Sequence, residues 1–182
     1  MQCVILLSKS FFKLIRWTNL LMIATMMLLV YYSLMSPLFM GGVLGVMPDM
    51  PAFLLLLLSM IFIVAGGYVI NDIFDVEIDR INKPDKLIIT NVFSEKESKL
   101  FYVILTCIGM VSGLISSILI SGSRFYTLFA ILLLLVYTLY VYSSTYKKKL
   151  LVGNIIVSLS VAFSVFLPWL FEVLYLANNS LI

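Results

Sequence analysis

The chain has 182 residues, of which 63% are hydrophobic and 12% are charged, and its mean hydropathy is +1.14. A soluble domain of this length cannot bury so much apolar surface, so a lipid bilayer must supply the missing apolar surroundings. The net charge of +3 comes from short Lys and Arg clusters beside hydrophobic segments, which argues against a nucleic-acid partner. Backbone groups inside a bilayer must pair internally, so the sequence predicts a single all-α, polytopic membrane helix bundle over residues 1–182.

Scarce residue types exclude several kinds of chemistry. The chain has no histidine, which removes the commonest general base and most transition-metal sites. Cys3 and Cys107 are far apart, and Cys107 lies in an apolar run, so neither a disulfide framework nor a zinc site is indicated. Any metal bound here is therefore expected to have oxygen ligands.

About five stretches are long and apolar enough to cross a bilayer as helices. The predicted spans are residues 20–39, 52–71, 100–120, 125–146 and 150–176. The apolar run after Lys9, Lys13 and Arg16 is too long for the core of a signal peptide, so we interpret it as a retained first span. Residues 72–99 form a polar cytoplasmic loop that holds most of the acids, and its end, residues 94–100, has the composition of an interfacial helix.

The positions of the basic residues predict an orientation. With five spans, the N-terminus, residues 72–99 and residues 147–149 lie on one side of the membrane. Eleven of the twelve Lys and Arg residues are then on that side, and only Arg124 is opposite. Because cytoplasmic flanks carry the excess of Lys and Arg, we expect an integral, multi-pass protein of a bacterial or archaeal-type plasma membrane, with its N-terminus and aspartate loop in the cytoplasm.

A concentrated polar site follows the second span, where Asn71, Asp72, Asp75 and Asp79 are close together in sequence. If the helix continues by two or three turns, the three aspartates fall within roughly 60° of one another. Carboxylates on one stripe near a bilayer repel one another and lose hydration, and a divalent cation resolves that conflict. Because Mg²⁺ combines one or two carboxylates with phosphate oxygens, the stripe predicts a Mg²⁺ site that holds a diphosphate.

A simpler interpretation is that these acids only end a helix and are solvated in a loop, balanced by neighbouring bases. The helical phasing of the aspartates argues against it, as do Gly66 and Gly67, which allow another helix or a ligand to approach. Arg80, Lys83 and Lys86 follow directly and are placed to neutralise phosphate. The residues alone leave the two interpretations balanced.

Three segments resemble a known family. Asn71, Asp72, Asp75 and Asp79 have the spacing N-D-x-x-D-x-x-x-D, and Arg80, Asn82 and Pro84 follow. This resembles the first aspartate-rich motif of the UbiA-type intramembrane prenyltransferases. Residues 15–19 resemble the family's R-x-x-N start, and residues 142–154 resemble its tyrosine-lysine loop before the fifth helix, so residues 12–170 can be laid on the family's N-terminal half.

The resemblance implies that the chain is a transferase of prenyl groups. Asn71, Asp72, Asp75 and Asp79 would bind Mg²⁺ and the diphosphate of a polyprenyl diphosphate donor. Further diphosphate-binding residues would be Arg16, Asn19, Arg80, Lys83, Tyr142, Lys147 and Asn154. The interval after Tyr142 is one residue longer than the simplest form of the family's loop, so either Lys147 or Lys148 is the counterpart. The chemistry implied is departure of diphosphate and capture of the prenyl cation by a lipid-soluble or glycerol-phosphate acceptor.

The pattern also departs from the family. Its members are nine-helix bundles with a second aspartate-rich motif, whereas Glu172 is the only acid after Glu97 in this chain. We therefore expect a partial UbiA-type fold without the C-terminal half, and no catalysis by this truncated chain alone. The residues of the motif and of the tyrosine-lysine loop resemble those of the branch that prenylates geranylgeranylglyceryl phosphate.

Two non-catalytic alternatives remain, a cation-binding or transport subunit and a structural bundle. A conduction path would place polar residues in the middle of several spans, and these spans are nearly free of charge there, which disfavours transport. The CDP-alcohol phosphotransferases also use an aspartate-rich Mg²⁺ site, but their D-G-x-x-A-R opening is missing around Asp72.

Overall fold

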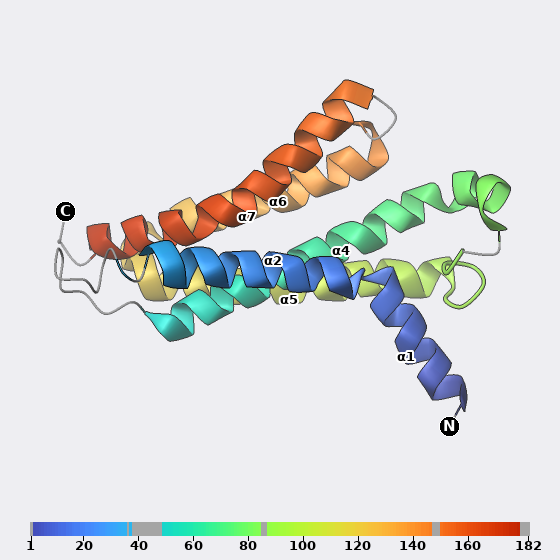
Figure 1. The fold of residues 1–182 in the computed structure, drawn as a ribbon, viewed down its shortest axis with the longest axis horizontal. Helices are drawn as coiled ribbons and strands as arrows, with labels where there is room; N and C mark the ends of the chain where they lie inside the picture. Colours follow the sequence, from blue (N-terminus) through green and yellow to red (C-terminus); the bar gives the residue numbers. More distant parts are fainter. Residues whose placement is uncertain (1, 36, 38–48, 85–86, 147–149, 179–182) are drawn as a thin grey trace.

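A computed structural model describes residues 2–35, 37, 49–84, 87–146 and 150–178 (Figure 1). In chain order the elements are α1 (Gln2–Leu14), α2 (Trp17–Val30), the π-helical turn η1 (Tyr31–Met35), α4 (Met50–Asn82), α5 (Glu95–Ser121), the 3-10 turn η3 (Gly122–Arg124), α6 (Tyr126–Ser144) and α7 (Leu150–Asn178). Within these ranges the chain forms no β-strand, and the predicted all-α membrane bundle is confirmed.

Five helices are long and apolar enough to cross a membrane. They correspond to the five predicted spans and cover Trp17–Leu34, Met50–Asn82, Glu95–Ser121, Tyr126–Ser144 and Val161–Asn178. The first predicted span, residues 20–39, begins earlier than expected, at Trp17, and its last part lies outside the described residues. The number of spans therefore agrees with the reading of the sequence.

Part of the predicted polar loop, residues 72–99, is helical instead. Helix α4 continues to Asn82 and ends just before Pro84, which disfavours helical backbone in the residue preceding it. Helix α5 begins at Glu95 because Ser94 caps it: the Ser94 hydroxyl accepts from the Glu97 amide at 3.2 Å, and the Glu97 carboxylate accepts from the Ser94 amide at 2.7 Å. The aspartates therefore belong to a rigid helix rather than to a loop.

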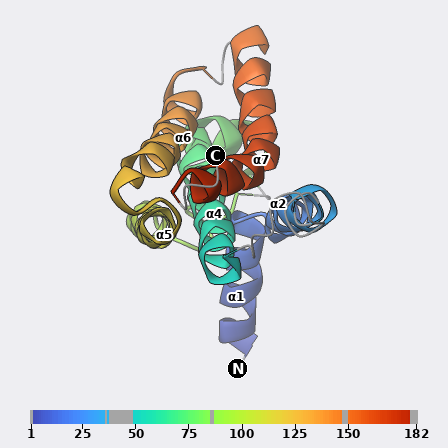
Figure 2. The ribbon, with the colours of Figure 1, turned by 90° about the vertical axis from the view of Figure 1, so that its left-hand side faces the viewer.

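Helix α4 runs through the middle of the bundle, with α2, α5, α6 and α7 around it (Figure 2). Its buried residues Phe53, Leu56 and Met60 form one core cluster with side chains of α2, α6 and α7. Tyr31 of η1 stacks on Phe53 with ring centroids 3.8 Å apart. This position puts α4 in contact with all four of these helices, while Leu54 and Leu58 on its remaining face are exposed.

Helices α4 and α5 pack closely because small residues line their contact. A Cβ atom placed on Gly109 would lie 3.0 Å from both the Ser59 carbonyl oxygen and the Ile63 amide nitrogen of α4. A Cβ on Gly66 would lie 2.8 Å from the Thr106 hydroxyl of α5, and one on Gly67 would lie 3.0 Å from Leu139 of α6. Small residues at these positions let the backbones approach, as the sequence indicated for Gly66 and Gly67.

Replacing Gly109 by Val is expected to destabilise the bundle by about 2 kcal/mol, because two of the three nearest obstructing atoms belong to the backbone of α4 and the two helices must separate. The measurement is the midpoint of thermal unfolding of the detergent-purified protein. Cys107→Val is the matched control, since Cys107 is exposed on the same helix. Equal midpoints for the two variants would show that α4 and α5 are not packed at Gly109.

Toward its C-terminal end, α4 diverges from α6 and α7 (Figure 1). A second apolar cluster there joins α4 to α1 and α5 and to the connection between α4 and α5. Phe11 of α1 packs edge-on against Phe101 of α5, with centroids 5.3 Å apart, and Leu14 and Ile15 are buried. The helix α1, which the sequence did not predict as a separate element, is thereby anchored beside the start of α2.

Candidate functional site

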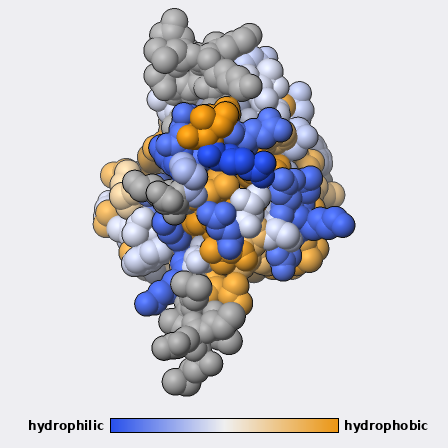
Figure 3. Space-filling model, turned by 90° about the vertical axis from the view of Figure 1, so that its right-hand side faces the viewer, coloured by the Kyte–Doolittle hydropathy of each residue, from blue (hydrophilic) through white to orange (hydrophobic). Residues whose placement is uncertain are grey.

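A cavity of about 930 Å³ opens between α2, α4, α6 and α7. One part of its lining is polar: Arg16, Asn19, Tyr68, Asn71, Asp72, Asp75, Asp79, Asn82, Lys83, Tyr142, Ser143, Ser144 and Ser164. The rest is mainly apolar: Ile23, Met60, Val64, Phe74, Ile78, Leu135, Leu139 and Val161. Hydrophilic residues gather at this end of the molecule (Figure 3). The cavity therefore suits an amphiphile with a charged head and an apolar tail.

The acidic stripe of α4 faces this cavity. Asn71, Asp72, Asp75 and Asp79 all line it and are partly buried, whereas Glu77 is exposed and does not line it. Residues three and four apart share one face of a helix, so the continuation of α4 to Asn82 brings the stripe to one wall. The helical phasing expected from the sequence is what the structure shows.

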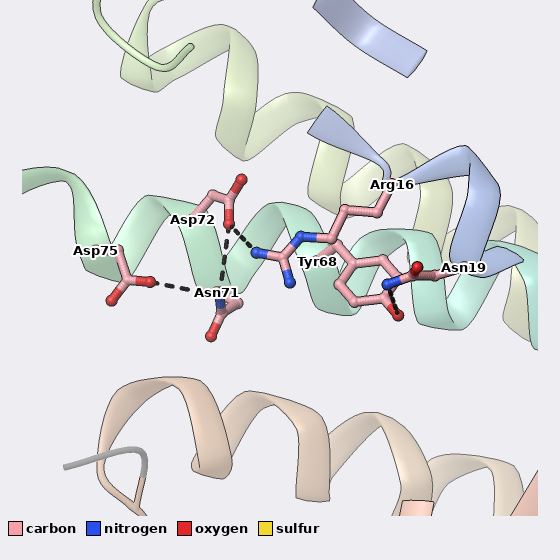
Figure 4. A network of polar contacts seen from close by, with 6 residues as sticks. All are labelled: Arg16, Asn19, Tyr68, Asn71, Asp72 and Asp75. Atoms are coloured by element: carbon pink, nitrogen blue, oxygen red, sulfur yellow. Dashed lines mark hydrogen bonds and ion pairs between the residues drawn. The ribbon is translucent and has the colours of Figure 1, made fainter. Parts of the chain in front are cut away.

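Within the stripe, Asn71 lies between two carboxylates. Its amide nitrogen is 3.5 Å from Asp72 Oδ1 and 3.4 Å from Asp75 Oδ2, and it donates to both (Figure 4). In the part of the chain that the structure describes, no three acidic side chains are close enough to hold one ion together. The site offers one or two carboxylates at a time, which is the number that Mg²⁺ uses when phosphate oxygens and water complete its shell. The donor set, all oxygen, therefore fits that ion.

Arg16 reaches the stripe from the start of α2. Its Nη2 donates to Asp72 Oδ1 at 2.9 Å, and its guanidinium lies over the Tyr68 ring, 4.8 Å from the centroid (Figure 4). Asn19 holds that ring in turn by donating to the Tyr68 hydroxyl at 3.2 Å. Arg16 has φ 52° and ψ 55°, a left-handed conformation that costs a non-glycine residue about 1 kcal/mol. The kink between α1 and α2 places this cation against the aspartates.

The structure brings most of the other predicted residues to the cavity, with one exception. Lys83 and Tyr142 line it, as do Arg16 and Asn19. Arg80 is exposed and does not line it, because the residue after Asp79 is rotated about 100° away from the stripe. The structure therefore does not bring Arg80 to the cavity, and its role in diphosphate binding stays a prediction.

Four predicted positions lie beyond what the structure describes. Lys86, Lys147 and Lys148 fall outside the described residues. Asn154 belongs to α7, but its side chain is outside the described part of the chain. Their roles stay predictions.

Tyr68 and Asn82 are polar lining residues that were not assigned a role from the sequence. Tyr68 lies four residues before Asp72, and Asn82 lies three residues after Asp79, so both continue the same helical stripe. Their spacing in the sequence predicts that they share a face with the aspartates, but only if α4 is helical as far as Asn82. No local sequence pattern predicts the contact between Arg16 and Tyr68, because 52 positions of sequence separate the two residues.

The chain matches the model of the UbiA prenyltransferase family over residues 34–180. It is 40% identical to a digeranylgeranylglyceryl phosphate synthase of Sulfurisphaera tokodaii over 114 residues, which are 61% of this chain and 38% of that protein. It is 35% identical to a protein of the same name from Methanocaldococcus jannaschii over 123 residues, which are 64% of this chain and 41% of that protein.

A solved structure described as concerning digeranylgeranylglyceryl phosphate synthase in membranes superimposes with a TM-score of 0.68 and 30% sequence identity. The match covers 98% of this chain and 59% of that one. The matched parts thus span less than half the length of these two curated relatives. The resemblance to the family is confirmed, and so is the resemblance to its glyceryl phosphate branch. The chain belongs to the UbiA prenyltransferase family.

Proposed function

We propose that this protein takes part in Mg²⁺-dependent transfer of a polyprenyl group from a polyprenyl diphosphate to a lipid acceptor that carries a glycerol phosphate. The observation that carries the proposal is the cavity of about 930 Å³ in which the acidic stripe of α4 adjoins an apolar interior. A prenyl diphosphate has a charged head and a long apolar tail, and both parts of the lining match it. Family membership and the names of the relatives support the same assignment.

The diphosphate head belongs at the polar end of the cavity. One or two of the carboxylates of Asp72, Asp75 and Asp79, with Asn71 beside them, would hold Mg²⁺, which when bound neutralises the diphosphate and makes it a better leaving group. The cations Arg16 and Lys83, with Asn19 and Tyr142, are placed to contact the remaining phosphate oxygens. Lys147 and Asn154 stay predicted additions to this set.

The lining residues also shape the transfer step. The allylic C–O bond of the donor breaks, diphosphate leaves with the electron pair, and the acceptor hydroxyl oxygen forms the new C–O bond while its proton passes to the released diphosphate. Apolar side chains such as Met60, Leu135 and Leu139 line the cavity beyond the head group and keep water from the prenyl chain. Phe74 lines the same cavity and packs edge-on against Tyr140 of α6 at 5.9 Å, which fixes the wall next to Asp75.

The acceptor class follows from the relatives, whose printed name describes synthesis of a digeranylgeranylglyceryl phosphate. We place the N-terminus and the aspartate end of the bundle in the cytoplasm, because eleven of the twelve Lys and Arg residues belong to segments on that side.

The test is binding of radiolabelled geranylgeranyl diphosphate to the full chain in lipid nanodiscs. We expect saturable binding with Mg²⁺ and a loss of at least about tenfold in affinity when EDTA removes the metal, because the carboxylates and the diphosphate then repel each other. Farnesol, which has an apolar tail and no diphosphate, is the control ligand and should not compete. Binding that is indifferent to Mg²⁺ would contradict the proposal, and Mg²⁺ binding without diphosphate binding would favour a cation-binding subunit instead.

The same preparation, supplied with geranylgeranyl diphosphate and geranylgeranylglyceryl phosphate, is expected not to form product. In the described residues, the acids that line the cavity all come from α4, so they face the diphosphate from one side only. Clear turnover in the presence of Mg²⁺ would overturn this expectation.

A further inference from the structure

A second, smaller cavity of about 290 Å³ lies where α1 meets α2. Its lining is Lys9, Lys13, Arg16, Trp17, Thr18 and Asn19. Two of these residues, Arg16 and Asn19, also line the large cavity. The two cavities therefore share a wall.

The charge of the small cavity is entirely positive. None of its lining residues is acidic, and the first acid in the chain is Asp49. Lys9 and Lys13 are four residues apart, so they lie on one face of α1, where like charges repel each other. Among the described residues, no ion pair joins Lys9 or Lys13 to an acidic side chain. An anion that bound between them would relieve this repulsion.

The packing of α1 fixes the lysines in that position. On one side the helix is held by Phe11 against Phe101, and Leu14 is fully buried. Lys9 and Lys13 are exposed, and the left-handed kink at Arg16 turns α2 so that Arg16 and Trp17 complete the cavity. Trp17 is 52% exposed next to an apolar span, the position at which tryptophan anchors a helix at the membrane surface. The cavity is therefore an open basic pocket on the protein surface, next to a tryptophan at a position typical of a membrane anchor.

We propose that this basic pocket binds the phosphate monoester of the acceptor lipid. The assignment rests on the proposed function, which supplies a glycerol-phosphate acceptor but does not place it. When Lys9 and Lys13 hold the phosphate, the lipid chain lies beside Trp17 in the bilayer. The glycerol hydroxyl then points past Arg16 and Asn19, which line both cavities, toward the donor. Lysines suit this role because they bind phosphate as compact point charges.

The test compares ligands on the full chain in nanodiscs of neutral lipid. The probes are geranylgeranylglyceryl phosphate, the same lipid without its phosphate, inorganic phosphate, and geranylgeranyl diphosphate with Mg²⁺. In the double variant Lys9→Gln with Lys13→Gln, affinity for the lipid phosphate is expected to fall at least about tenfold, whereas affinity for the diphosphate changes less than about twofold. The double variant Lys96→Gln with Lys99→Gln removes the same charge from exposed lysines of α5 and should change neither affinity.

Each alternative result is informative. An unchanged affinity for the lipid phosphate, or an equal loss of diphosphate affinity, would overturn the assignment. Inorganic phosphate that competes as well as the phospholipid would show a site for free phosphate and would overturn it too. Absence of Mg²⁺-dependent diphosphate binding by the unmodified protein would overturn the proposed function itself, and with it the lipid's role as acceptor, whatever the lysine variants show.

Discussion

Replacing Asp72 by Asn is expected to weaken Mg²⁺-dependent binding of geranylgeranyl diphosphate by about a hundredfold. The substitution keeps the shape of the side chain and removes one of the carboxylates that Asn71 connects, so the site loses a charged ligand and gains none. Losing a charged partner in a partly buried site costs about 1.5–3 kcal/mol, and each 1.4 kcal/mol is tenfold in affinity. The measurement is the dissociation constant of the radiolabelled donor with saturating Mg²⁺.

Glu77→Gln is the matched control, because Glu77 belongs to the same helix but is exposed and does not line the cavity. We expect its dissociation constant to stay within about twofold of the unmodified protein. Equal effects of Asp72→Asn and Glu77→Gln would mean that only the overall acidity of α4 matters, and the proposal of a specific site on the cavity wall would be rejected.

Replacing Arg16 by Gly is expected to change the affinities for diphosphate and for Mg²⁺ in opposite directions. The diphosphate loses a cation from the cavity wall, so its affinity should fall by about tenfold or more. Asp72 loses the guanidinium at 2.9 Å that competes with a metal, so Mg²⁺ alone should bind at least as tightly as before. Isothermal titration with each ligand separately measures both effects.

The backbone at Arg16 provides a control for folding. Glycine adopts the left-handed conformation without strain, so Arg16→Gly should not lower the thermal unfolding midpoint of the protein. Arg16→Ala removes the same guanidinium but keeps the strained conformation. Both variants should show the same change in binding, and a change confined to Arg16→Ala would attribute the effect to the kink between α1 and α2 rather than to the charge.

The two cavities together suggest why α1 is held against the bundle. Arg16 contributes to both, and its position depends on Tyr68, which Asn19 holds by a hydrogen bond. Helix α1 packs through Phe11 and Leu14 while Lys9 and Lys13 line the small cavity. Under the two proposals above, recognition of the donor phosphates would belong to α4 and recognition of the acceptor phosphate to α1.

Helix periodicity made the aspartate stripe predictable. The positions of Asp72, Asp75 and Asp79 on one face follow from 3.6 residues per turn, which is a local property of the chain. The extension of α4 to Asn82 was harder to predict from the sequence, because hydropathy falls at Asn71 and a span is recognised by its apolar residues alone. Arg80 does not line the cavity for a related reason, since proximity in sequence to Asp79 does not put two residues on one face of a helix.

The sequence by itself determined that the chain is a helical membrane bundle with about five spans and one acidic stripe, since hydropathy, span length and helical phase are encoded over short distances along the chain. Only the tertiary structure decided what the stripe faces and what shares its cavity. Arg16 meets Asp72 across 56 positions, and α1 reaches Phe101 across a still larger separation, through contacts that depend on the packing of whole helices. Such contacts follow from the summed fit of many side chains, which no local pattern specifies.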